Sequence, residues 1–467
     1  VTLDEGAQSE AVLAPGLFAA TNSFTVINSN SFTGTFDFSY SGTTLYNVSD
    51  EYLADGAGYV IHVDRISFAE IPGLNGNGSN LGQAIDNALG NVDPDSDLAK
   101  KLSQILTSSP EEYADALNQL AGSQDGDLMN AGMSQPTRLL QIVFGELSGF
   151  GGFGIADLGT LVKVADNQVT TTMNDAGPGY SVTTGTAVAR PISVWARVFG
   201  SWASLDRSTN SAGFTSDGGG VVVGGDYQFT ENFAAGLAAG YQRDRVDFRG
   251  TGKSDIDSWS ISAYAKYEMD KAYVNGLLGY SWQDYDTDRR FAVLGTNYNA
   301  HHSTDGGTFS AGAEAGYNYD IGDKAKLVPY VSFFYGHTTI DGATETGASP
   351  FNLVLSDRSA NSAQSKLGVR WTKTFASSGG TEWTPTLDLG WKHEFGDSNP
   401  STTAAISGLA GSSFSMIGAD AARDAAVVGA GINLKFSDQI DGTVQYNGEY
   451  SSDYTDNVAS LKLRLRF

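Results

Sequence analysis

The chain has 467 residues, of which 57 are glycine and none is cysteine, and its formal net charge is −25. The lack of cysteine excludes disulfide bonds and thiolate metal sites, and the acidic balance argues against nucleic acid as a partner, because phosphate binding needs clustered Lys and Arg. Charged residues make up only 17% of the chain, below the roughly 25% of soluble domains, which indicates a protein with little salt-rich surface.

Residues 1–79 contain short apolar stretches separated by Asn, Ser, Thr and Gly. This pattern predicts short strands and turns. The segment carries nine acidic residues against the single basic residue Arg65, and it is too small to build a large core alone. We interpret it as the last coils of a β-solenoid, or as a small β-cap.

Residues 80–147 place apolar side chains at helical spacing. Asp93-Pro94 predicts the start of a second helix, because an acid followed by Pro is typical of a helix N-terminus. Ser109-Pro110, followed by two Glu residues, predicts the start of a third helix, which Gly122 ends. The apolar positions of the first two helices are Leu81, Ile85, Ala88, Leu89, Leu98, Leu102, Ile105 and Leu106.

A further helix is predicted at about 128–147, and it carries the charged residues Arg138 and Glu146. Residues 148–190 are rich in Gly, Thr and Ala and are interpreted as a linker, although a helix at 155–173 is an alternative. All seven Trp residues follow Pro191, and the net charge of residues 1–190 is −16 against −9 for the remainder. We therefore place a domain boundary near Pro191.

Residues 191–467 form a long series of segments in which apolar and polar residues alternate, as they do in β-strands. One segment, for example, sets Trp259, Ile261, Ala263, Ala265 and Tyr267 against Ser and Lys neighbours. The twelve segments run over roughly 192–204, 218–230, 233–248, 256–269, 271–286, 306–320, 325–340, 361–375, 381–396, 424–436, 440–451 and 457–467.

Two features favour a membrane barrel over the alternative, a large soluble β-sandwich. The apolar faces begin and end with Trp or Tyr, which is typical of the aromatic girdles that flank a lipid band. The segments are also long enough to cross a bilayer at a tilt, and short turns alternate with long polar connections. The long connections are expected at 205–217, 249–255, 287–305, 341–360 and 397–423. The predicted fold is thus a twelve-stranded antiparallel transmembrane β-barrel.

Charged residues on the opposite faces of these strands are predicted to face the lumen. They either pair with one another or contact a segment held inside the barrel, which at twelve strands is wide enough for one helix. The candidates are Arg197, Lys266, Glu268, Glu314, Arg370, Asp388, Lys392, Glu449, Arg464 and Arg466. Arg138 and Glu146 of the predicted 128–147 helix are their candidate partners.

Several stretches together resemble the monomeric (type Va) autotransporters of Gram-negative bacteria. In the connector, Ser123 stands where that family usually has an acid. The resemblance covers about 80–467, and the stretches that carry it are 116–122 (ALNQLAG), 194–197 (VWAR), 423–424 (RD), 428–431 (VGAG), 446–450 (YNGEY) and 463–467 (LRLRF).

The resemblance implies a C-terminal translocator barrel at 191–467, a connector at 80–190 with a pore helix in the lumen, and the end of a passenger at 1–79. It implies export of that passenger, which stays anchored at the cell surface (type V secretion). The implied location is the outer membrane of a Gram-negative bacterium, with residues 1–79 extracellular. The implied partners are outer-membrane lipid, periplasmic chaperones and the barrel-assembly machinery, which would read Phe467 as its signal.

Other functions remain as alternatives. A surface adhesin or structural protein would act through residues 1–79, and a diffusion porin would pass solutes through the barrel. We expect no enzyme, because the sequence has no G-x-S-x-G elbow and its five His residues form no H-E-x-x-H. No cofactor or metal ligand set is predicted.

Overall fold

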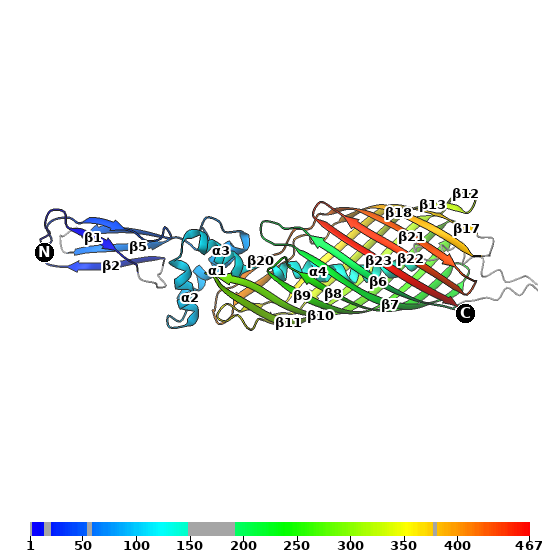
Figure 1. Cartoon of the computed structure of the whole chain (residues 1–467), viewed down its shortest axis with the longest axis horizontal. Coiled ribbons are helices and arrows are strands. Elements are labelled where there is room, and N and C mark those ends of the chain that lie inside the picture. The colour runs from blue at the N-terminus through cyan, green and yellow to red at the C-terminus, as the bar shows by residue number, and fades with distance from the viewer. Residues whose placement is uncertain (1, 14–19, 54–57, 148–191, 377–380) are drawn as a thin grey trace, which may run out of the picture.

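The computed structural model describes residues 2–13, 20–53, 58–147, 192–376 and 381–467. The chain is elongated, with a strand-rich N-terminal segment at one end, a cluster of helices in the middle and a β-barrel at the other end (Figure 1). The C-terminus lies at the end of the barrel that is farthest from the helices.

The N-terminal segment contains two small sheets. The first is a parallel pair, and the second is antiparallel with the order β2-β5-β4. Stacked solenoid coils would pair in parallel, so the antiparallel sheet agrees better with the small β-cap that the sequence also allowed. The strands are β1 (Gln8–Ala11), β2 (Thr21–Asn28), β3 (Asp37–Tyr40), β4 (Tyr46–Tyr52) and β5 (Gly58–Arg65).

Three helices, α1 (Gly76–Ala88), α2 (Asp97–Leu106) and α3 (Pro110–Ala121), with the short η1 (Leu89–Asn91), form the helical cluster. A capping box starts α3: the Ser109 hydroxyl accepts from the Glu112 N–H and the Glu112 carboxylate accepts from the Ser109 N–H. The predicted start of the second helix at Asp93-Pro94 was wrong. Ser96 caps α2 instead, because its hydroxyl accepts from the Ala99 N–H.

The fourth helix, α4 (Gln124–Leu147), runs inside the barrel (Figure 1). It begins four residues before the predicted start at 128 and continues through Pro136. The alternative pore helix at 155–173 and the linker at 148–190 lie outside the described residues. No helix in the described part of the chain is both long and apolar enough to span a membrane.

Twelve long antiparallel strands form the barrel, and strands that are neighbours in sequence are also neighbours in space. The barrel closes between β23 and β6, and β12 (Tyr319–Gly322) and β17 (Phe375–Ala376) are short additions to the same sheet. The twelve strands are β6 (Ile192–Leu205), β7 (Phe214–Thr230), β8 (Phe233–Asp247), β9 (Gly252–Met269), β10 (Ala272–Val293), β11 (Thr296–Tyr317), β13 (Ala325–Ile340), β16 (Arg358–Lys373), β18 (Glu382–Glu394), β21 (Asp424–Lys435), β22 (Ile440–Tyr450) and β23 (Tyr454–Arg466).

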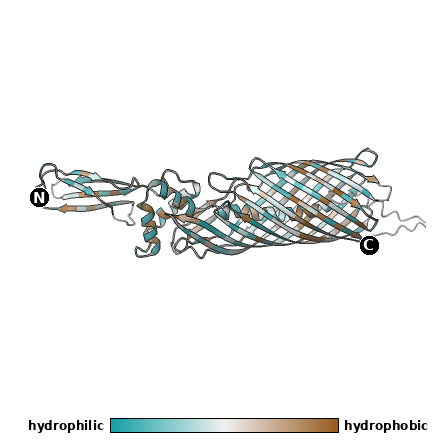
Figure 2. Cartoon of the chain, in the orientation of Figure 1, coloured by the Kyte–Doolittle hydropathy of each residue, from teal (hydrophilic) through white to brown (hydrophobic). Residues whose placement is uncertain are grey.

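The outer face of the barrel carries the predicted apolar band. Leu237 is 68% exposed, and Trp259 and Tyr267 stand at the two ends of an outward-facing row on β9. Beyond Trp282 on β10 the same face continues with Asp284, which is exposed. Figure 2 shows brown residues along the barrel surface and a more polar rim near the helices. The lipid band therefore ends at these Trp residues, and the strands extend past it.

One predicted loop, 287–305, was wrong. β10 and β11 continue as a paired hairpin that turns only at Leu294-Gly295, where both residues have positive φ, as a tight two-residue hairpin turn requires. This part of the hairpin lies beyond the lipid band, so its outer face is polar. The contrast between faces that reveals a strand is therefore lost.

Two more predicted loops, 341–360 and 397–423, are also partly ordered as strands. They meet in a four-stranded sheet with the order β14-β15-β19-β20, above the barrel mouth on the side of the helices. Its strands are β14 (Ala343–Thr344), β15 (Leu353–Leu355), β19 (Ser401–Ile406) and β20 (Phe414–Ile417).

Candidate functional site

The candidate site is the lumen of the barrel, which α4 occupies. The apolar face of α4, including Leu139, Ile142 and Val143, packs on inward-facing Trp195 and Tyr264 of the β6–β10 wall. Burial of such side chains stabilises the contact without fixing how deep the helix sits. Three polar contacts along α4 supply that specificity.

The first polar contact, at the C-terminal end of α4, centres on Glu146. Its carboxylate accepts from Lys462 Nζ at 3.1 Å and from an Arg464 guanidinium nitrogen at 2.8 Å, and it also pairs with Arg197. All four side chains are almost completely buried. Arg197 and Lys462 lie directly opposite each other across the β6–β23 closure. One buried anion thus ties the helix to the seam of the barrel.

The second contact lies near the middle of α4. Arg138 donates from Nε to Asp456 at 2.8 Å and from a terminal nitrogen to Asp244 at 2.5 Å. The two acids come from β23 and β8, on different parts of the wall. The predicted partners of Arg138 did not include Asp456 or Asp244. The alternation of β8 does place Asp244 on the inward face, together with Gln242.

The third contact holds the N-terminal end of α4 at the barrel mouth. An Asp125 oxygen lies 3.2 Å from an Arg358 nitrogen and 3.3 Å from His302 Nε2. Two residues further along α4, Asp127 accepts from the Ala419 N–H at 2.7 Å. Sequence reasoning missed this contact, because His302 and Ala419 were assigned to loops.

Close backbone packing accompanies the third contact. Gly126 of α4 lies against Gly418, and a Cβ added to Gly126 would come 2.4 Å from the Gly418 nitrogen. No side chain larger than hydrogen fits there without a shift of the loop or the helix. The two glycines allow the β20–β21 connection to cross directly over the start of α4.

Most of the predicted lumen residues do face inward, and most of their ion pairs are with other residues of the barrel wall. Of the ten, Arg197 and Arg464 form ion pairs with α4. The other pairs are Arg370 with Glu314 (3.0 Å), Lys266 with Glu268 (3.7 Å), Asp388 with Lys366 (2.9 Å), Arg466 with Asp441 (2.7 Å), and Lys392 with Glu449. Phe467 is exposed at the end of the closing strand, where its N–H donates to the Ile192 carbonyl.

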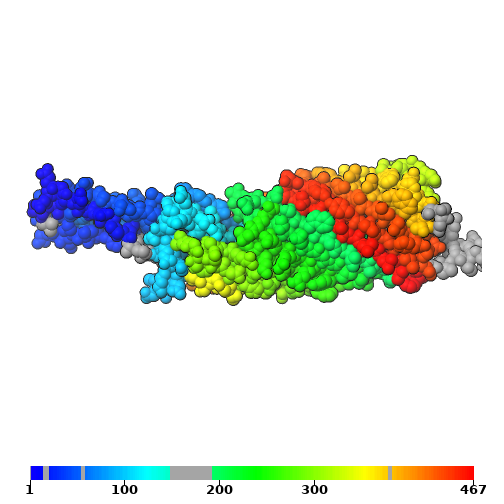
Figure 3. Space-filling model, in the orientation of Figure 1, coloured from blue at the N-terminus to red at the C-terminus, as the bar shows by residue number. Residues whose placement is uncertain are grey.

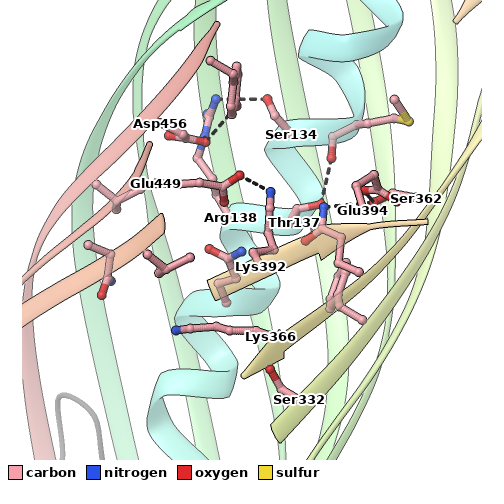
Figure 4. A pocket seen from close by; sticks show the side chains of 18 of the residues that line it. Ser134, Thr137, Arg138, Ser332, Ser362, Lys366, Lys392, Glu394, Glu449 and Asp456 are labelled. Carbon is pink, nitrogen blue, oxygen red and sulfur yellow. Dashed lines mark hydrogen bonds and ion pairs between the residues drawn. The ribbon is translucent and has the colours of Figure 1, made fainter. Parts of the chain in front are cut away.

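A cavity of about 230 Å³ remains beside α4, on the side of Lys366 and Lys392. Figure 4 shows Thr137 and Arg138 of the helix beside Lys392, Glu449 and Asp456 of the lining, with Arg138 bonded to Asp456. The cavity is large enough to hold several water molecules, so α4 does not fill the whole lumen on this side.

Among the described residues, one group of potential metal ligands lies together: Asp125, His302 and Glu345. Both carboxylates already pair with a guanidinium, Asp125 with Arg358 and Glu345 with Arg289. The two arginines balance the two negative charges without a metal ion. We interpret this group as part of the ion-pair network at the mouth.

The structure is an outer-membrane β-barrel of the translocator class. It has an outward apolar band, twelve strands that close into a barrel, and a lumen that holds a helix of the same chain. The autotransporter beta-domain family model matches residues 194–447, more than half of the chain. The chain belongs to this family.

The chain is also similar to several curated proteins and solved structures. Esterase EstA of Pseudomonas aeruginosa is 27% identical over 272 residues, which cover 56% of this chain and 41% of that protein. An extracellular serine protease of Serratia marcescens is 24% identical over 286 residues, which cover 58% and 26%. The translocator domain of autotransporter NalP from Neisseria meningitidis has 16% identity and a TM-score of 0.49, covering 59% of this chain and 89% of that one.

The beta domain of the Bordetella autotransporter BrkA has 18% identity and a TM-score of 0.46, covering 59% and 100%. This chain spans about two fifths of EstA and about a quarter of the Serratia protease. Family membership confirms the predicted resemblance, the translocator barrel and the outer-membrane location. The porin and adhesin alternatives are not favoured, and a lumen occupied by α4 does not suit a diffusion pore.

Proposed function

We propose that this barrel carries the N-terminal part of its own chain to the cell surface and then anchors it there, with α4 as the last segment to enter the lumen. The observation that supports this proposal is the position of α4. Its N-terminal end meets the helical cluster at one barrel mouth, and its C-terminal end, at Glu146, meets the first strand near the opposite mouth. Among the described residues, α4 thus extends through the pore from one mouth toward the other.

In this proposal residues 1–79 are the extracellular end of the passenger, residues 80–190 are the connector with its pore helix, and residues 191–467 are the translocator. The charge pairs of the lining support it. Pairs such as Glu314–Arg370 form within the barrel wall and need no partner from the lumen. Such a lining is polar without exposing unpaired charges that would trap a chain in transit.

The proposed partners are outer-membrane lipid, periplasmic chaperones, the barrel-assembly machinery and the passenger itself. Phe467, exposed at the end of the closing strand, is the proposed recognition residue for assembly. The names of the relatives, an esterase and serine proteases, describe those proteins. We assign no catalytic role to the barrel of this chain.

The test is protease treatment of intact cells, followed by detection of one epitope within residues 1–79 and one in the turn at 270–271. Loss of the first epitope, with the second protected, is the expected result. Protection of both epitopes until the outer membrane is opened would place residues 1–79 in the periplasm. That outcome would refute the proposed export.

A further inference from the structure

The helical cluster and the barrel loops share one hydrophobic core. We call α1, η1, α2 and α3 the connector cap. We call the four-stranded sheet with its connecting loops, together with the tip of the β10–β11 hairpin, the platform. Figure 3 shows the cap, in cyan, seated on the end of the barrel. The cap contributes Leu81, Ile85, Ala88, Leu102, Ile105 and Leu117 to the core. The platform contributes Phe291, Val293, Phe351, Leu353, Ile406 and Met416.

Neither half of this core is complete without the other. The cap helices have only 10 to 13 residues, a length at which helices are marginal in water unless they pack on something. The platform, without the cap, would leave its buried Phe and Leu side chains facing water as an apolar patch. The two halves are far apart in sequence, so their association is a docking event.

Asparagine side chains of the cap pair with the backbone of β20, the edge strand of the platform, and of the turn that precedes it. Asn77 is fully buried; its Nδ2 donates to the Ile417 carbonyl at 2.9 Å and its Oδ1 accepts from the Ile417 N–H at 2.8 Å. Asn80 donates to the Ser415 carbonyl at 2.9 Å, and Asn91 to the Ala410 carbonyl at 2.9 Å. These side chains supply backbone partners that an edge strand otherwise lacks.

A second set of bonds joins the cap to the β10 extension. Arg289, which is fully buried, donates to the Leu120 carbonyl at the end of α3 at 3.0 Å and to both oxygens of Glu345 at 2.7 Å. The Ala292 N–H donates to Gln119 Oε1 at 2.7 Å. A guanidinium at a helix C-terminus also complements the helix dipole. The cap is thus held on two sides by polar contacts that involve no residue of α4.

We propose that the platform is a docking site for the connector cap that keeps the exported N-terminal part on the cell even when the chain is cut between α3 and α4. This inference rests on the proposed export, because the cap reaches the platform only from outside. The barrel would then hold its passenger by two independent anchors: the covalent path through the lumen, and the non-covalent cap.

The junction between α3 and α4 offers a place for the cut. Gly122 has a positive φ, and together with Asn118 and Ser123 it lines an open groove at the surface. A protease recognition sequence with flexible flanks, inserted after Gly122, can reach solvent through this groove. The full chain with this insertion is displayed on intact cells and cut, and the fragment of residues 1–122 is followed in the cell pellet and in the medium.

We expect the cut fragment to remain with the cells and to leave on denaturation. Asn77→Ala should release the fragment at least about tenfold faster. The reason is that the buried hydrogen bonds of Asn77 are lost, and a buried hydrogen bond typically changes a dissociation rate by about a factor of ten. Asn87→Ala is the matched control, because Asn87 is an exposed residue of α1 whose side chain accepts a hydrogen bond from Gln83 of the same helix. Asn80→Ala, at a half-buried site, is the second variant if Asn77→Ala does not fold, and heat-modifiable gel migration verifies the barrel in each variant.

The outcomes separate the two proposals. If the uncut passenger is absent from the surface, or if the site is cut only after the membrane is opened, the proposed export fails. If the site is cut on intact cells and the parent fragment moves into the medium as rapidly as the Asn77→Ala fragment, export stands. The docking role of the platform is then overturned.

Discussion

Glu146→Gln tests whether the buried ion pairs of α4 hold this helix in the lumen. The substitution keeps the shape of the side chain but removes the anion that pairs with Lys462, Arg197 and Arg464. Removing one partner of a buried ion pair typically costs about 3–5 kcal/mol. Because Glu146 serves three cations, we expect a loss of seating free energy at least at the lower end of this range.

The assay uses the natural absence of cysteine. A single Leu140→Cys substitution, at an α4 position that is 4% exposed, reports how often the helix leaves the barrel wall, since a thiol reagent reaches it only then. A loss of about 3 kcal/mol corresponds to a labelling rate at least roughly 100-fold faster. Ionic conductance of the purified barrel in planar bilayers should rise in parallel.

The control is Glu449→Gln in the same Leu140→Cys background. Glu449 pairs with Lys392 inside the barrel but makes no ion pair with α4, so its loss affects the wall rather than the seating of the helix. Labelling of the Glu146→Gln variant within threefold of the parent, with a normally folded barrel, would refute the reasoning. Equal acceleration by both substitutions would show that any loss of lumen charge loosens the barrel.

Three further predictions follow from the same geometry. Arg138→Met leaves Asp244 and Asp456 without their cationic partner on α4. At a cost of about 3 kcal/mol for breaking such pairs, labelling in the Leu140→Cys assay should again be roughly 100-fold faster. Gly126→Ala should prevent full seating of α4, read as increased conductance, whereas Gly90→Ala, where a Cβ meets nothing within 4 Å, should have no effect. Burial raises the pKa of Tyr46 to about 12 and raises that of Tyr113 as well. Since the neutral phenols are favoured in the folded state, their stabilisation is complete below pH 10 and declines as the pH rises from 10 toward 12, which ultraviolet tyrosinate absorbance and protease release of the N-terminal segment should report together.

The barrel could be predicted from sequence wherever lipid lies against it. Lipid requires an apolar outer face, and the lumen requires a polar inner one. Apolar and polar residues therefore alternate clearly over 259–267. Beyond Trp282 both faces of β10 meet water or polar partners, and alternation no longer separates strand from loop. The same physical reason accounts for the small platform sheet, whose strands are only two to six residues long.

The lumen contacts were only partly predictable for a different reason. The alternation shows that Arg197 and Arg464 face inward, and helical spacing places Glu146 within a helix. Their meeting depends on how far α4 is inserted and how it is rotated about its axis, and neither is a property of a local stretch of sequence. The pairing of Asp125 with His302 depended further on a strand that the sequence did not reveal.

The order of charges along α4 explains how one depth of insertion is selected. An acid, Asp125, faces cations at the mouth; a base, Arg138, faces two acids in the middle; and an acid, Glu146, faces three cations at the far end. Arg138 and Glu146 are eight residues apart, about 12 Å along a helix at 1.5 Å per residue. A helix displaced by that distance would bring Arg138 among the three cations, where like charges repel in a poorly solvated site. Apolar packing on the wall tolerates sliding, whereas this alternation of sign does not, so the charges favour one depth of α4 in the lumen.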